Sequence, residues 1–228
     1  MKHKIYRIVC TALCCAPLLA TAQTGGKITS PQRLYEEGES LFRQKAFAAA
    51  MPPLQAFIKQ TDAEGAPVSA AGNKKEAEYM LVCAEYELRN PNSIELLREY
   101  LDAYPDTPHA NRICALIASA YFFEGKYDDA LAMFNSSRLD LLSNEERDDM
   151  TYRLATCYLK TGNVKEAAIW FETLRSTGSR YTADCTYYLA YIRYSQQRYD
   201  DALSGFLSLQ DNAKYEALVP YYIAEIYL

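Results

Sequence analysis

The chain has 228 residues and half of them are apolar, which is enough to bury the core of one or two domains. Lys and Arg number 24 against 29 Asp and Glu, so the net charge of −5 argues against a phosphate-binding surface and against a nucleic-acid partner. With only two histidines, His3 and His109, most histidine-based catalysis is excluded.

Residues 1–22 have the pattern of a signal peptide. Three cationic residues, Lys2, Lys4 and Arg7, precede an apolar run that is shorter than the roughly 20 residues of a membrane span. The small residues at 20–22 then form a cleavage site that would leave Gln23 as the first residue. We therefore expect an exported protein, periplasmic or associated with the outer membrane, with a flexible N-terminus over 23–30 and no transmembrane span.

The alternative is a lipoprotein signal, in which a small residue stands directly before the acylated cysteine. Cys10, Cys14 and Cys15 follow Val, Leu and Cys, which do not fit that pattern. Cleavage after residue 22 leaves 21 basic and 29 acidic side chains, so the mature chain is plainly acidic.

A repeat organises the chain after this segment. The pentapeptide at 127–131, Tyr-Asp-Asp-Ala-Leu, recurs at 199–203, and the segment 163–168 lies between them in the same register. Two further series agree on the period: Ala118, Ala155, Ala190 and Ala224, and the pairs Ala130/Phe134, Ala167/Phe171 and Ala202/Phe206. Within each period the apolar spacing predicts two helices with a turn between them.

The pattern resembles the tetratricopeptide repeat, an array of helical hairpins with a period of about 34 residues. The family's motif of a small residue, an aromatic, a turn glycine, an alanine and a second aromatic stands complete twice: Ala118, Tyr121, Gly125, Ala130, Phe134, and Ala155, Tyr158, Gly162, Ala167, Phe171. The next period departs from it, with Arg193 and Gln197 in place of the aromatic and the glycine.

The resemblance implies an all-α fold, a right-handed superhelix of antiparallel helical hairpins. We expect about five and a half hairpins over residues 31–228, with a loop insertion at 61–73. Three helix starts are marked in the sequence. Ser30-Pro31 and Thr107-Pro108 have the order of an N-cap and a first helical residue, and Ser143 with Glu146 forms a capping box.

The last segment, 217–228, repeats only the first helix of a hairpin and ends in apolar residues. Repeat arrays usually end in a polar capping element, because each unit buries its face against a neighbour. We therefore expect residues 1–228 to be the N-terminal part of a longer protein. The alternative is association of a partner, or of a second copy, with this uncapped helix.

The resemblance implies a binding function, because the first helices of such hairpins line a concave groove that holds peptides or proteins. The groove positions here are aromatic, and the predicted partner-binding residues are Phe122, Tyr152, Tyr187, Tyr191, Tyr194 and Tyr221. Helical aromatic stripes commonly belong to a core. The alternative is a contact surface, since tyrosine gives a large rigid area and a hydroxyl group.

Catalysis, cofactors and metals find no support in the sequence. The one histidine left after cleavage, His109, is expected to face solvent near a helix start, and the acidic pairs are expected to be solvated charges. Cys83, Cys114, Cys157 and Cys185 have no metal-ligand spacing, and we expect buried thiols rather than disulfides.

Two functions remain. The first is a non-catalytic scaffold for protein–protein interaction in the bacterial cell envelope, with other envelope proteins or peptides as partners. The second is glycan or small-ligand binding by the tyrosine-rich groove. A lipid-attachment cysteine, which some glycan-capturing lipoproteins with similar repeats carry, is not evident here.

Overall fold

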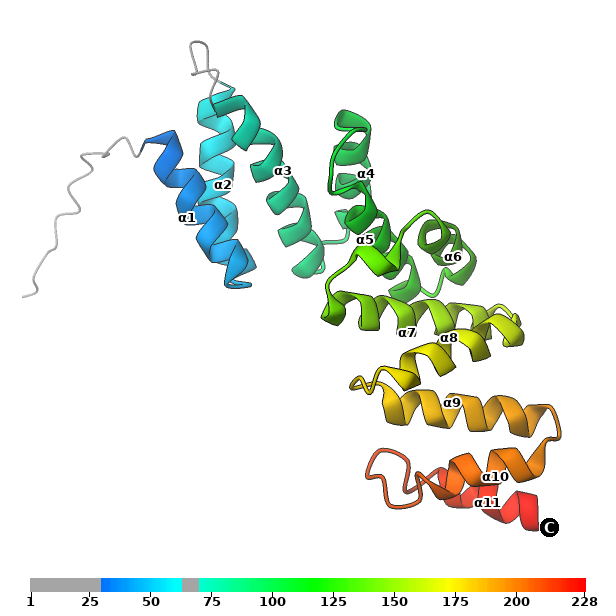
Figure 1. Cartoon of the computed structure of the whole chain (residues 1–228). Coiled ribbons are helices and arrows are strands. Elements are labelled where there is room, and N and C mark those ends of the chain that lie inside the picture. Colours follow the sequence, from blue (N-terminus) through cyan, green and yellow to red (C-terminus); the bar gives the residue numbers. More distant parts are fainter. Residues whose placement is uncertain (1–29, 63–69) are drawn as a thin grey trace, which may run out of the picture.

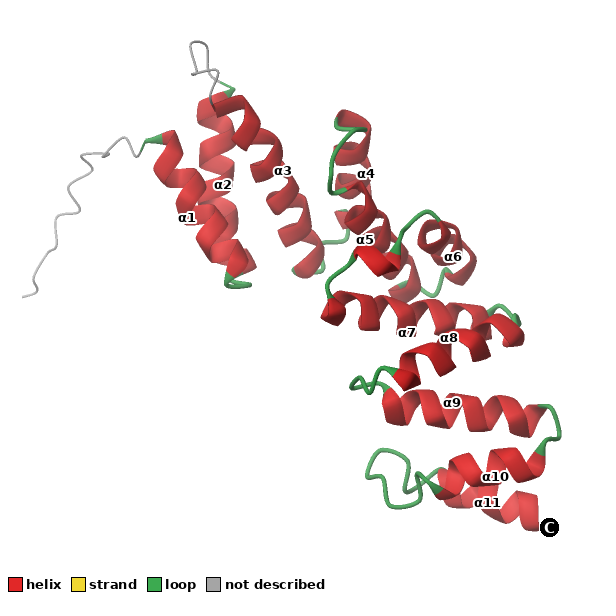
Figure 2. Ribbon diagram, in the orientation of Figure 1, coloured by secondary structure: helices red, strands yellow, loops and turns green. Residues whose placement is uncertain are grey.

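The computed structural model describes residues 30–62 and 70–228, and all regular structure in this part of the chain is helical (Figure 2). The predicted signal peptide and almost all of the segment 23–30 lie outside the described residues. The helices are α1 (Pro31–Arg43), α2 (Phe47–Thr61), α3 (Ala70–Glu87), α4 (Ser93–Ala103), α5 (Ala110–Phe123), α6 (Tyr127–Asn135), the short 3₁₀ helix η1 (Leu139–Leu141), α7 (Asn144–Lys160), α8 (Val164–Ser176), α9 (Thr182–Ser195), α10 (Tyr199–Leu207) and α11 (Val219–Tyr227).

Neighbouring helices pack in chain order as antiparallel pairs, from α1/α2 to α9/α10, and α11 packs on α10. Figure 1 shows the pairs stacked from α1 at one end to α11 at the other, with a wide change of direction between α3 and α7. The predicted all-α solenoid of helical hairpins is confirmed.

The repeated small and aromatic residues make the core of this stack. Ala130, Ala167 and Ala202 are fully buried, and the phenylalanines four residues later, at 134, 171 and 206, are at most 2% exposed. Burying such a side chain stabilises the fold by roughly 1.5–3 kcal/mol. The small alanine side chains leave room for the neighbouring helix. The alanine and the phenylalanine four residues later therefore place both contacts on the same buried face of the helix.

The turns inside the hairpins need a residue in the left-handed region. Gly125 and Gly162 have φ values of +73° and +82°, which glycine adopts without steric cost. Gln197, in the period that departs from the motif, has the same backbone conformation with φ +60°. The hairpin of α9 and α10 therefore has the same turn conformation, although glutamine replaces glycine there.

Two boundary predictions need correction. Helix α3 begins at Ala70, so the predicted insertion at 61–73 is too long at its C-terminal end; residues 63–69 lie outside the described part. Helix α5 begins at Ala110, and Thr107 is not its N-cap: the Thr107 hydroxyl accepts a hydrogen bond from the His109 amide at 3.3 Å, which closes a short turn before the helix. The capping prediction for α7 is confirmed, because the Ser143 hydroxyl accepts from the Glu146 amide at 3.4 Å.

All four cysteines of the described residues are free thiols. Cys83, Cys157 and Cys185 are buried, as predicted, and burial raises the pKa of each thiol to about 12. Cys114 is only half-buried.

Candidate functional site

Three of the predicted groove residues lie together on one face of α9. Tyr187, Tyr191 and Tyr194 are spaced by four and three residues, and each contacts the ring of Tyr222 on α11, with ring centroids 6.4, 6.1 and 5.3 Å apart. We call these four residues together with Tyr221 the tyrosine cluster. It spans the surface between α9 and α11.

A carboxylate joins two members of the cluster. The hydroxyl groups of Tyr194 and Tyr221 each donate a hydrogen bond to Glu225, at 2.7 Å in both cases. These bonds lower the pKa of Glu225, and the same carboxylate raises the pKa of Tyr194 to about 12. The charge on Glu225 therefore fixes the orientation of two rings at the surface.

The cluster is partly core and partly surface. The ring of Tyr187 stacks on Tyr215 at 4.8 Å, and the ring of Tyr222 stacks on Phe206 at 4.9 Å with an interplanar angle of 6°. Tyr191 and Tyr221 are 38% and 61% exposed. These two side chains offer the area that a partner could contact.

The two remaining predicted residues lie apart from the cluster. Tyr152 of α7 stacks on Tyr181 at 4.4 Å, and burial raises its pKa. Phe122 of α5 packs against Phe123 and Tyr127 of its own hairpin, at 5.5 and 6.0 Å. The structure therefore brings four of the six predicted residues together, places Tyr152 one repeat earlier and leaves Phe122 outside the group.

Successive repeats are joined by a set of polar contacts that the sequence analysis does not predict, and we call this set the polar ladder. Its rungs join residues 30 to 34 positions apart: Glu76 with His109, Tyr79 with Arg112, Arg112 with Glu146, Ser119 with Arg153, Asp149 with Arg180 and Tyr181, and Asp184 with Lys214 and Tyr215. Opposite charges at the spacing of the repeat were the signal that could have revealed several of them.

Arg112 is the central residue of the ladder. Its guanidinium donates to the Glu146 carboxylate at 2.6 Å and to the Tyr79 hydroxyl at 2.5 Å, so one side chain of α5 links α3 and α7. Burial raises the pKa of Glu146, but the charge of Arg112 and the hydrogen bonds from Ser143 and Arg112 outweigh burial and lower it overall. The ladder thus holds an ion pair between α5 and α7 (Arg112–Glu146), between α7 and the turn before α9 (Asp149–Arg180), and between α9 and the loop before α11 (Asp184–Lys214).

His109 belongs to this ladder, which corrects its expected solvent-facing position. Its ring stacks on Tyr79 with 3.6 Å between centroids, and its Nε2 atom lies 2.9 Å from the Glu76 carboxylate. Both neighbours belong to α3, one hairpin earlier. The residues next to His109 in the sequence give no sign of these contacts.

A cavity of about 390 Å³ lies over the N-terminal rungs of the ladder. Phe42 and Phe47 line one side, and Arg112, Glu146 and Asp149 line the other. Lys45, in the turn after α1, approaches Glu145 at the start of α7 to 3.7 Å. The turn after α1 and the start of α7 therefore approach each other beside Arg112 and Glu146.

Within residues 30–62 and 70–228, no group of His, Cys, Asp and Glu side chains is arranged to hold a metal ion. In the same residues, no helix has both the length and the apolarity to cross a membrane.

Comparison with known proteins agrees with this architecture. The tetratricopeptide repeat model matches residues 115–181. The structure is similar to MamA of AMB-1, with a TM-score of 0.59 and 18% identity over 81% of this chain and 92% of that one. It is also similar to PilF of Pseudomonas aeruginosa, with a TM-score of 0.56 and 14% identity over 86% of this chain and 88% of that one.

A third similar structure has TPR-like repeats from a kinesin light chain of Podospora anserina, with a TM-score of 0.53 and 15% identity over 83% of this chain and 99% of that one. No curated protein matches the sequence. At these identities the structural likeness shows the fold alone. The described chain is a solenoid of helical hairpins, and within it residues 115–181 match the tetratricopeptide-repeat family.

Proposed function

We propose that this protein is a non-catalytic scaffold that binds a partner protein or peptide on the tyrosine cluster. The observation that carries the proposal is the exposure of Tyr191 and Tyr221 beside rings that are fixed from behind. Tyr187 and Tyr222 are held by stacking on Tyr215 and Phe206, and Tyr221 is held by Glu225. A contact surface whose rings are already ordered loses little side-chain entropy when a partner binds.

The same geometry favours a protein over a glycan as the partner. Glycan platforms present the open face of an aromatic ring, whereas Tyr187 and Tyr222 each have a ring face covered by stacking. The exposed rings and hydroxyl groups of Tyr191 and Tyr221 suit the mixed apolar and hydrogen-bonding contacts of a protein interface.

The proposal includes a location outside the cytoplasm, in the periplasm or at the outer membrane. The support is the pattern of residues 1–22, in which three cationic residues, a short apolar run and small residues follow one another. The partners proposed for such a scaffold are other proteins or peptides of the cell envelope.

The test compares a double variant with a matched tyrosine control. Tyr191→Ala with Tyr221→Ala removes the exposed part of the cluster, whereas Tyr227→Ala removes a tyrosine of α11 that is 69% exposed and outside the cluster. Native complexes are captured from crosslinked cells, and each co-purifying protein is quantified by mass spectrometry.

We expect one protein to be recovered in stoichiometric amount with the wild type and with Tyr227→Ala, and at least tenfold less with the double variant. Equal recovery with all three proteins would overturn the proposed site. If no protein partner depends on the cluster and soluble polysaccharides raise the melting temperature of the wild type only, the glycan alternative replaces it.

A further inference from the structure

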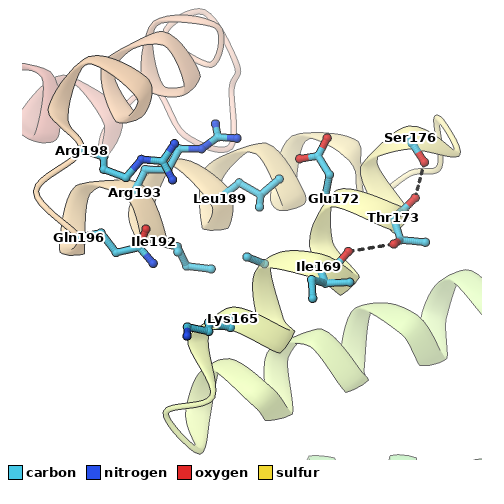
Figure 3. A pocket seen from close by; sticks show the side chains of 11 residues that line it. Lys165, Ile169, Glu172, Thr173, Ser176, Leu189, Ile192, Arg193, Gln196 and Arg198 are labelled. Atoms are coloured by element: carbon cyan, nitrogen blue, oxygen red, sulfur yellow. Dashed lines mark hydrogen bonds between the residues drawn. The ribbon is translucent and has the colours of Figure 1, made fainter.

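A second surface lies on the opposite side of α9 from the tyrosine cluster. At 100° per residue, positions 189, 193 and 196 of a helix point away from positions 187, 191 and 194. They line a pocket of about 760 Å³ between α8 and α9. Figure 3 shows Lys165 and Ile169 on the α8 side of this pocket, and Leu189, Ile192 and Arg193 on the α9 side.

The pocket combines an apolar floor with a cationic rim. Leu189 and Ile192 form the floor, and Ile169 stands at its edge with 56% of its surface exposed. Lys165, Arg193 and Arg198 supply positive charge in a chain whose net charge is −5. A binding site of this kind is complementary to an apolar side chain next to a carboxylate.

The charges on the rim are largely available to a partner. Glu172, the acidic residue of the pocket, pairs with Arg175, and Arg198 pairs with Asp201 at 2.5 Å. Lys165 and Arg193 enter no ion pair within the part of the chain that the structure describes.

The repeat itself shows that these side chains are not required by the fold. The position of Lys165 is occupied by Asp128 and Asp200 in the neighbouring repeats, where acidic residues complement the N-terminal end of the helix dipole. A lysine in the first turn of α8 opposes that dipole, so helix stability does not explain it.

Two more departures from the repeat meet at the same pocket. Ile169 stands where the neighbouring repeats have Ala132 and Ser204. Arg193 stands where they have tyrosines at 121 and 158, whose hydroxyl groups bond back to the preceding second helix, to Arg98 at 2.7 Å and to Asn135 at 3.5 Å. One pocket therefore gathers three side chains that the repeat pattern does not predict.

We propose that the pocket between α8 and α9 is a second protein-binding site, which takes an acidic peptide segment with an apolar side chain beside its carboxylate. The apolar side chain lies against Leu189, Ile192 and Ile169, and the carboxylate lies between Lys165 and Arg193. The site is separate from the tyrosine cluster, so the scaffold can hold two partners on opposite faces of α9.

The test replaces the three unusual residues by those of the neighbouring repeats. The triple variant Lys165→Asp, Ile169→Ala, Arg193→Tyr is expected to fold with a melting temperature at least equal to that of the wild type, because Asp complements the helix dipole and Tyr matches the repeat. Random ten-residue peptides displayed on phage are selected on the wild-type protein and counter-selected on the triple variant. Selected peptides are then synthesised, and their affinity is measured by fluorescence anisotropy.

We expect enrichment of peptides with Asp or Glu beside a large apolar residue, binding at least tenfold weaker to the triple variant and to Lys165→Asp alone, and unchanged binding to Tyr191→Ala. Failure to recover such peptides, enrichment of basic ones, or equal binding to the triple variant would overturn the proposal. Binding of anionic phosphatidylglycerol vesicles through the same three residues, without peptide binding, would also overturn it and point to a membrane surface.

Discussion

Arg112 of α5 and Glu146 of α7 lie 34 positions apart in the sequence and form an ion pair with 2.6 Å between Nε and Oε1. Both side chains are about 70% buried, and Arg112 also donates to Tyr79 of α3. One arginine therefore fixes three successive first helices relative to one another. In a solenoid, stability comes largely from the interfaces between neighbouring repeats, and this arginine contributes to two of them.

Loss of this arginine is expected to weaken the array. Arg112→Ala removes the hydrogen bonds to Glu146 and Tyr79 and leaves the Glu146 carboxylate without its charged partner, so we expect a loss of about 2 kcal/mol in the free energy of unfolding. Arg138→Ala is the control, because the Arg138–Asp140 pair is well exposed and such pairs contribute at most about 1 kcal/mol. The free energies of unfolding of both variants are measured by urea unfolding, with circular dichroism as the signal. Equal losses for the two variants would show that the ladder does not stabilise the repeat boundaries.

The same pair predicts a pH dependence. The pKa of Glu146 is lowered in the folded protein from its ordinary value of 4.5, so the folded state binds this proton less tightly than the unfolded state. The contribution of Glu146 to stability is then complete above pH 4.5 and declines as the pH falls toward the lowered pKa.

The Glu146→Gln variant lacks this titration. Its melting temperature should fall less than that of the wild type between pH 6 and pH 3, and it should lie below the wild type at pH 6 because the ion pair is absent. Parallel melting curves of the two proteins across that pH range would contradict the assigned role of Glu146.

The turn of the fifth hairpin offers a stabilising substitution. Gln197 has φ +60°, a conformation that costs a residue with a Cβ atom roughly 1–2 kcal/mol. Because Gly125 and Gly162 occupy the same position in earlier turns, Gln197→Gly is expected to raise the free energy of unfolding by about 1 kcal/mol, part of the gain being offset by chain entropy. Gly162→Ala should change it by a similar amount in the opposite direction. Thermal unfolding of the two variants and the wild type measures these changes. A lower unfolding midpoint for Gln197→Gly than for the wild type would refute the shared turn conformation.

The close approach of α9 and α10 depends on Gly205. A Cβ atom at this position would lie 2.8 Å from the Cβ atom of Ala190, which is shorter than an ordinary contact. Gly205→Ala is expected to destabilise the protein by about 1–3 kcal/mol through overpacking. The neighbouring Ser204→Ala, at an exposed helical position, should leave the midpoint within experimental error. A Gly205→Ala protein as stable as Ser204→Ala would mean that the two helices have room to separate.

The repeat could be predicted from sequence because its signature residues are those that packing restricts most. Ala118, Ala155 and Ala190 are fully buried where helices approach closely, and a larger residue there would have to displace a helix. Gly125 and Gly162 are restricted by backbone conformation in the same way. Spacing alone therefore identified the hairpins and the faces that form the core.

The polar contacts could not be predicted to the same extent, because the residue types that form them change along the array. Glu76 and His109 form one rung of the ladder, whereas at the next boundary Arg112 and Glu146 form another with different residues. Tyr215 and Lys214 lie in a loop without helical periodicity, and only the fold places them against Asp184 of α9. Charges one repeat apart suggest such pairs, but the register of the helices decides which of them meet.

In the proposed function, Tyr191 faces a partner protein. A photocrosslinking amino acid placed at position 191, and separately at the exposed position 227 of α11, tests this directly in intact cells. We expect one protein adduct from position 191 that is absent from position 227 and is lost when Tyr221→Ala is added. An adduct that forms equally at both positions, or that persists in the Tyr221→Ala protein, would contradict it.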